Sequence, residues 1–112
     1  MRLLGTVIGL LLFAAAGRAA DDATGARLFA ERCSGCHGDH GHGDGPAAAA
    51  LVPKPRNFVD ATFWKDRTLE QVKAVVTNGK PPMMPGFVGV LTDAEIDAVA
   101  RFVRRFDPGA AK

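Results

Sequence analysis

The sequence contains few of the residues that enlarge or cross-link a small core. Among its 112 residues there are two cysteines, one tryptophan and no tyrosine. The two cysteines lie three positions apart, and a disulfide that closes so short a loop would stabilise the fold little. A chain of this length forms one small domain, whose core gains from an additional apolar body. The scarcity of aromatic residues therefore favours a fold that a bound hydrophobic group completes.

Net charge is also lacking once the N-terminal segment is set aside. The chain has 14 basic and 12 acidic residues, which gives a formal net charge of +2. Arg2 and Arg18 are the only charged residues before Asp21, so the remainder carries 12 basic and 12 acidic residues. A neutral domain without a run of like charges gives no support for a nucleic-acid partner and no indication of a protein partner's charge.

The first twenty residues have the pattern of a secretory signal peptide. A positive start, Met1-Arg2, precedes an almost entirely apolar segment at 3–16, and small residues follow. The apolar segment is too short to cross a bilayer comfortably, which disfavours the alternative of an uncleaved anchor. We predict a signal peptide at residues 1–20, cleaved between 16 and 20, a single domain at 21–112, and export to the periplasm.

The two cysteines and the histidine after them form the strongest motif of the sequence, Cys33-Ser34-Gly35-Cys36-His37. No strand-like run precedes the cysteines, which argues against a thioredoxin-like redox pair. A zinc site would need four ligands, with two taken from His37, His40 and His42, and the usual spacer is absent. C-x-x-C-H is the attachment signature of a c-type haem, in which two thiols bind adjacent vinyl groups and the histidine binds the iron. The motif therefore predicts one covalent haem c, with zinc as the main alternative and with His40 and His42 on a solvated loop.

Apolar periodicity and capping patterns predict an all-α domain. Apolar residues recur at helical spacing, and Thr68 with Gln71 and Thr92 with Glu95 match capping boxes. Gly79 ends the middle helix, and Asp107-Pro108-Gly109 ends the last. Glycine and proline exclude regular structure from most of the remainder, apart from short turns near 47–52 and 60–65. The predicted helices are 23–32, 68–78 and 92–106, and the predicted loops are 38–45, 46–60 and 80–89.

The order of these elements resembles the single-haem, bacterial type of class I cytochrome c over essentially the whole mature chain. Gly25 and Phe29 match the family's small and aromatic residues on the first helix. Val99, Phe102 and Val103 match the pattern on the last helix, which crosses the first in that family. The resemblance implies the cytochrome c fold, in which three main helices and long irregular loops surround one haem.

The resemblance also implies the residues that contact the haem. The second axial ligand should be a methionine before the last helix, and we favour Met84, which directly precedes a proline, over Met83. The family's proximal histidine donates to a proline carbonyl, for which Pro53 is favoured over Pro46 and Pro55.

A further expectation is that Trp64 and Arg56 contact the haem propionates. Iron bound by His37 and Met84 is closed to substrates, which suits electron transfer and raises the reduction potential. The expected function is therefore that of a periplasmic electron carrier, not an enzyme, with redox proteins as partners. A haem-c subunit of a larger oxidoreductase, peripheral to a membrane respiratory complex, is the first alternative, and an open-site ligand-binding or peroxidatic haem protein is the second.

Overall fold

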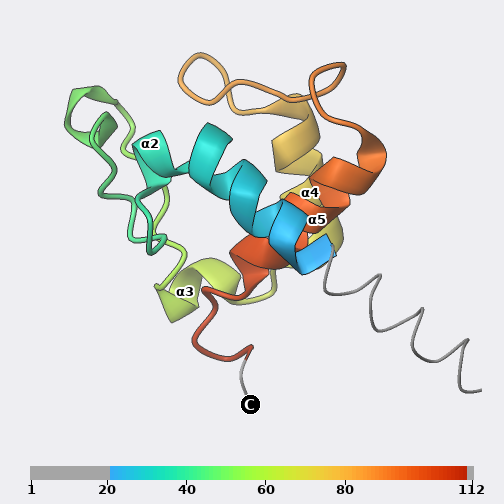
Figure 1. Cartoon of the computed structure of the whole chain (residues 1–112). Coiled ribbons are helices and arrows are strands. Elements are labelled where there is room, and N and C mark those ends of the chain that lie inside the picture. Colours follow the sequence, from blue (N-terminus) through green and yellow to red (C-terminus); the bar gives the residue numbers. More distant parts are fainter. Residues whose placement is uncertain (1–20, 111–112) are drawn as a thin grey trace, which may run out of the picture.

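The computed structural model describes residues 21–110, and it consists of helices joined by long irregular segments (Figure 1). The predicted signal peptide lies outside the described residues. Within them no strand occurs, only two isolated bridges, Lys80 with Met84 and Val88 with Leu91. The helical segments after the first helix, 21–32, are α2 Ser34–His37, the 3₁₀ turn η1 Ala48–Ala50, α3 Ala61–Trp64, α4 Leu69–Asn78 and α5 Asp93–Arg104. The prediction of an all-α domain is confirmed.

The first helix crosses α5 at a point where a glycine removes the side chain between them. A Cβ atom on Gly25 would overlap the carbonyl oxygen of Ala98 and lie 3.0 Å from the Cβ atom of Phe102. Next to this contact, Phe29 and Phe102 pack with their ring centroids 5.2 Å apart. The predicted packing of these two helices therefore occurs. It holds the first helix, which ends just before α2, against α5.

Both long C-terminal helices begin with the predicted capping boxes. The Thr68 hydroxyl accepts from the Gln71 amide at 3.1 Å, and Thr92 accepts from the Glu95 amide at the same distance. Each pair satisfies two backbone donors that a helix start would otherwise leave without a partner. Gly79 ends α4 with a φ of 72°, a conformation that favours glycine.

The core consists of two clusters of buried side chains, and the first helix, α4 and α5 contribute to both. One is mainly aromatic and lies beside the cysteines: Phe29, Phe58, Phe63, Trp64, Val72, Ala100 and Val103. The other is mainly aliphatic and lies toward the end of α4: Leu28, Val76, Phe87, Leu91, Ile96 and Val99. Within residues 21–110, no helix is both long and apolar enough to span a membrane.

Candidate functional site

The cysteine and histidine side chains are positioned by α2, whose N-cap is Cys33. The amides of Cys36 and His37 both donate to the Cys33 carbonyl, at 3.2 and 2.9 Å. Residues three and four positions apart on such a turn lie on one face, so the two thiols and the imidazole are neighbours. Both thiols are free and half-buried. The motif therefore presents two sulfur atoms and one ring nitrogen from a single turn of helix.

The thiol of Cys33 is held in its protonated form at neutral pH. Burial, followed by repulsion from Cys36, raises its pKa to about 11. A catalytic redox cysteine requires the opposite shift, because its thiolate is the nucleophile. This environment argues against a thioredoxin-like pair.

The imidazole of His37 is held in a fixed orientation by contacts on two sides. Its Nδ1 lies 3.3 Å from the carbonyl oxygen of Arg56, which accepts only, so Nδ1 carries the proton. The ring of Phe58 stacks on the imidazole at a centroid distance of 4.5 Å. Burial lowers the pKa of His37, and the hydrogen bond to Arg56 partly opposes the shift. The ring is thus neutral, with Nε2 available as a metal ligand.

The carbonyl that accepts the hydrogen bond from His37 in the structure is that of Arg56, and not that of Pro53 as predicted. The segment from Pro55 to Phe58 runs against the glycine-rich loop, where the Phe58 amide donates to the Gly41 carbonyl at 2.7 Å. A Cβ on Gly43 would lie 2.7 Å from the Pro55 carbonyl oxygen and 3.1 Å from that of Arg56. Glycine thus lets the two segments approach until the Arg56 carbonyl reaches the histidine, whereas Pro53 is exposed.

The propionate contact of Trp64 stays a prediction, but the structure places the indole in the core. Its indole nitrogen donates to the carbonyl oxygen of Phe58 over 2.6 Å, and the residue is 7% exposed. Its only donor is therefore used inside the core. Arg56 contributes its main chain to the site, while its guanidinium lies 5.0 Å from the centroid of Phe63. Sequence reasoning missed Phe58, whose only signal was a lone aromatic residue in a proline-rich segment.

The two candidate methionines differ in how the loop holds them. Met84 is half-buried, and its amide and carbonyl both pair with the backbone of Lys80, at 3.1 and 2.9 Å. Met83 is 43% exposed. Gly79 allows this turn, because a Cβ there would lie 2.6 Å from the Met84 carbonyl oxygen. The backbone of Met84 is therefore fixed on both sides.

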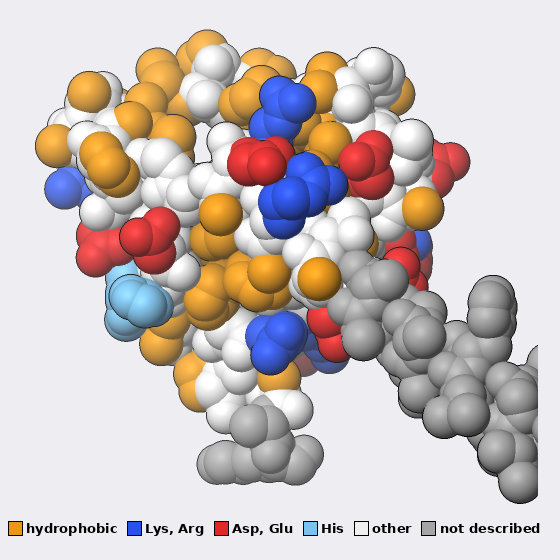
Figure 2. All heavy atoms as spheres, viewed as in Figure 1, with side chains coloured by type: hydrophobic (Ala, Val, Ile, Leu, Met, Phe, Trp, Pro, Cys, Tyr) orange, Lys and Arg blue, Asp and Glu red, His pale blue; other side chains and the backbone are white. Residues whose placement is uncertain are grey.

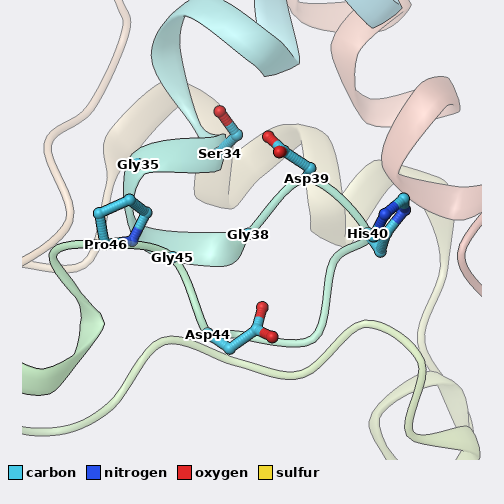
Figure 3. Close-up of a pocket in the computed structure, with 8 residues that line it drawn as sticks. All are labelled: Ser34, Gly35, Gly38, Asp39, His40, Asp44, Gly45 and Pro46. Carbon is cyan, nitrogen blue, oxygen red and sulfur yellow. The ribbon is translucent and has the colours of Figure 1, made fainter.

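The glycine-rich loop forms a separate polar cavity of about 310 Å³ (Figure 3). His40 lies on its rim, and Ser34, Asp39, Asp44 and Pro46 are among its other lining residues. Both His40 and His42 are exposed, as predicted. No group of three or more Cys, His, Asp or Glu side chains that could hold a metal ion occurs between residues 21 and 110. The zinc alternative therefore has no four-ligand site in this part of the chain.

An opening bordered by hydrophobic side chains lies near α2 (Figure 2). Figure 2 shows a gap between the segment that contains η1 and the turn after α4, with hydrophobic side chains along both sides. Free thiols and an oriented imidazole next to such a gap match the donor set of a covalently bound haem. An all-helical domain whose irregular loops surround this site has the architecture of a c-type cytochrome.

The chain belongs to the family described as cytochrome c oxidase, cbb3-type, subunit III, whose model matches residues 20–103. It is 40% identical over 84 residues to cytochrome c6 of Leptolyngbya boryana, covering 75% of this chain and 91% of that protein. It is 34% identical over 110 residues to the dihydro-heme d1 dehydrogenase of Pseudomonas aeruginosa, covering 96% of this chain. The chain spans 20% of the length of that dehydrogenase.

A solved structure confirms the fold. The KustC0563 c-type cytochrome matches with a TM-score of 0.63 and 30% sequence identity, over 73% of this chain and 95% of that one. The described domain is accordingly that of a c-type cytochrome, a family whose cofactor is covalently bound haem c with its iron. The proteins that it resembles thus include a cytochrome c6 and a dehydrogenase, and the family description names an oxidase subunit.

Proposed function

We propose that Cys33 and Cys36 carry the haem through thioether bonds and that His37 binds the iron through Nε2. The support is the hydrogen bond from Nδ1 to the Arg56 carbonyl, which leaves Nε2 as the free nitrogen of a neutral ring. The same hydrogen bond makes the imidazole a stronger ligand, since it shifts electron density toward Nε2. Phe58 excludes water from one face of the ring.

We propose Met84 as the second axial ligand. Its support is the turn that pairs both backbone groups of Met84 with Lys80, together with the burial that distinguishes it from Met83. A thioether ligand needs a rigid backbone, because its own side chain has several rotatable bonds. With His37 and Met84 both bound to the iron, the haem would supply one-electron chemistry and would offer no site for a substrate.

We infer that the protein is exported to the periplasm and acts there as an electron carrier rather than as an enzyme. The apolar leader at 1–20 supports export, and the fixed pair of candidate ligands supports a closed site. The second candidate is a haem-c subunit of a larger oxidoreductase. Two findings support it: the family description, and the match of this chain to a fifth of the length of the dehydrogenase.

An absorption spectrum of the purified mature protein tests the proposal. We expect a pyridine haemochrome of haem c, a weak red band from methionine-bound ferric iron, and no binding of carbon monoxide to the reduced form at neutral pH. Replacing both cysteines with alanine should abolish the covalent haem, whereas Ser34→Ala within the motif should retain it. Rapid binding of carbon monoxide by the wild type would refute a closed site. Stable co-purification with a catalytic subunit would favour the second candidate.

A further inference from the structure

The sequence contains two asparagines, and one of them is followed by glycine, in Asn78-Gly79. In such a pair the main-chain nitrogen of the glycine can attack the side-chain carbonyl carbon of the asparagine, because glycine has no side chain to obstruct the approach. Asn78 is exposed and is the last residue of α4, which passes there into the loop that leads to α5 (Figure 1). The other asparagine, Asn57, precedes the bulky Phe58. Spontaneous deamidation is therefore chemically favoured at one position, where α4 joins the turn that contains Met84.

The folded chain holds the attacking nitrogen in a hydrogen bond. The Gly79 amide donates to the Val75 carbonyl at 2.7 Å, so its proton is not free to leave. Two amides of the returning loop hold the same turn of helix, since they donate to the carbonyls of Val76 and Thr77 at 2.9 and 3.1 Å. A hydrogen-bonded amide reacts with base only from a locally opened state. Deamidation at Asn78 should therefore be slow while the last turn of α4 is intact and fast once that turn opens.

The main chain on both sides of this pair is closely packed. A Cβ atom on Gly86 would lie 2.7 Å from the carbonyl carbon of Asn78, and one on Gly79 would lie 2.6 Å from the Met84 carbonyl oxygen. The Lys80 amide donates to that same oxygen at 2.9 Å. An additional main-chain atom at this junction therefore has to move the turn that carries Met84.

We propose that Asn78-Gly79 is a deamidation site that the last turn of α4 protects, and that its isoaspartyl product releases the Met84 turn. The Gly79 nitrogen loses its proton to hydroxide and forms a bond to the side-chain carbonyl carbon of Asn78. The side-chain nitrogen leaves as ammonia, with a proton from water, and a succinimide remains. Water then opens the succinimide at either carbonyl, which gives an aspartyl or an isoaspartyl residue at position 78.

The two products differ in one respect that matters for the Met84 turn. Both place a carboxylate at the C-terminal end of α4, where the helix dipole is negative and disfavours it. The isoaspartyl product alone has one more methylene group in the main chain, and the packing at Gly86 and Gly79 leaves no room for it. Release of the turn should therefore follow the isoaspartyl product. This step rests on the proposed function, because Met84 is the proposed iron ligand.

The first test measures the reaction in the haem-loaded protein at mildly alkaline pH. Peptide mass mapping should find the conversion of an amide to a carboxyl group at Asn78 and not at Asn57. The rate should be about tenfold or more higher in concentrated guanidinium chloride than in buffer, because only the opened turn reacts. Equal rates in the two solutions, or no conversion at residue 78 in guanidinium chloride, would overturn the proposal.

Asn78→Gln is the matched control for this test. It keeps an amide at the end of α4, but its longer side chain would have to close a six-membered ring, which forms more slowly. The variant should therefore stay unmodified over the period in which the wild type reacts. Aged in parallel, it also gives the background of isoaspartate from Asp44-Gly45, the one Asp-Gly pair of the sequence.

The second test follows the iron in the aged protein. Chromatography separates the products, and isoaspartate methyltransferase identifies the isoaspartyl fraction. This fraction should lose the weak red band in its ferric form and bind carbon monoxide in its reduced form. Freshly prepared Asn78→Asp, which has the charge without the additional methylene group, should do neither. An isoaspartyl fraction that stays closed, or an Asn78→Asp variant that opens as readily, would overturn the proposal.

Failure of the proposed function would give a different pattern. An unaged wild type that binds carbon monoxide, or a Met84→Ala variant that keeps the red band, would refute the assignment of Met84. The mass at residue 78 and its dependence on denaturant do not involve the iron, so they report on the deamidation site in either case.

Discussion

Replacing Gly25 with alanine should destabilise the protein although alanine is the better helix former. In an open helix this exchange gains about 0.5–1 kcal/mol. At Gly25 the added methyl group would overlap the Ala98 carbonyl and lie 3.0 Å from the Cβ atom of Phe102. Backbone atoms yield less than the end of a side chain, and such overpacking costs about 1–3 kcal/mol. We expect a net loss of about 1 kcal/mol, or roughly 4–8 °C in Tm for a domain of this size.

Gly35 offers a matched control for this prediction. It lies within α2, and a Cβ there would meet nothing within 4 Å. Gly35→Ala should therefore keep or raise the stability of the haem-loaded protein, by up to about 1 kcal/mol. Urea unfolding of both variants, followed by circular dichroism, provides the comparison. A Gly25→Ala variant as stable as the wild type would refute the close crossing of the first helix and α5.

Three further predictions concern the ligand, the tryptophan and the acid limb of stability. Met84→Ala should open the sixth position to carbon monoxide and lower the reduction potential by on the order of 0.1 V, whereas Met83→Ala should change neither; exchanged phenotypes in CO titration and voltammetry would reverse the assignment. Trp64→Phe should cost about 1–3 kcal/mol in urea unfolding, because a buried carbonyl loses its donor, and should leave the potential unchanged; a shifted potential would instead support a propionate contact. The hydrogen bond from Arg101 lowers the pKa of Asp97 below its usual 3.8, so the stability from this contact is present above that pH and is lost as the pH falls through the lowered value. Asp97→Asn should thus be less stable than the wild type at pH 6, by about 0.5 kcal/mol or less at this half-exposed, solvent-screened site, and equal to it near pH 2 in pH-dependent urea unfolding. A difference that persists at pH 2 would exclude this origin.

Local patterns in the sequence were sufficient to predict the helices. The capping boxes at Thr68 and Thr92 depend on side chains three residues apart, so the sequence alone reveals them. The acceptor of the histidine could not be predicted in this way. Every residue offers the same main-chain carbonyl. Which carbonyl reaches His37, that of Arg56 or that of Pro53, depends on how two loops meet. The partner of the Trp64 indole depends on the same tertiary contact.

His37 donates to a main-chain carbonyl, so this hydrogen bond does not depend on the side chain of the residue that accepts it. Any side chain at position 56 keeps the carbonyl, so the imidazole should keep its orientation through substitutions there. The contact depends instead on Gly43, whose φ is 78° and whose missing side chain leaves room for the Pro55 and Arg56 carbonyls. A saturation scan that reads haem incorporation should therefore find tolerance at Arg56 and intolerance at Gly43, whose own contact with His37 is a main-chain hydrogen bond from its amide to the histidine carbonyl, at 2.7 Å.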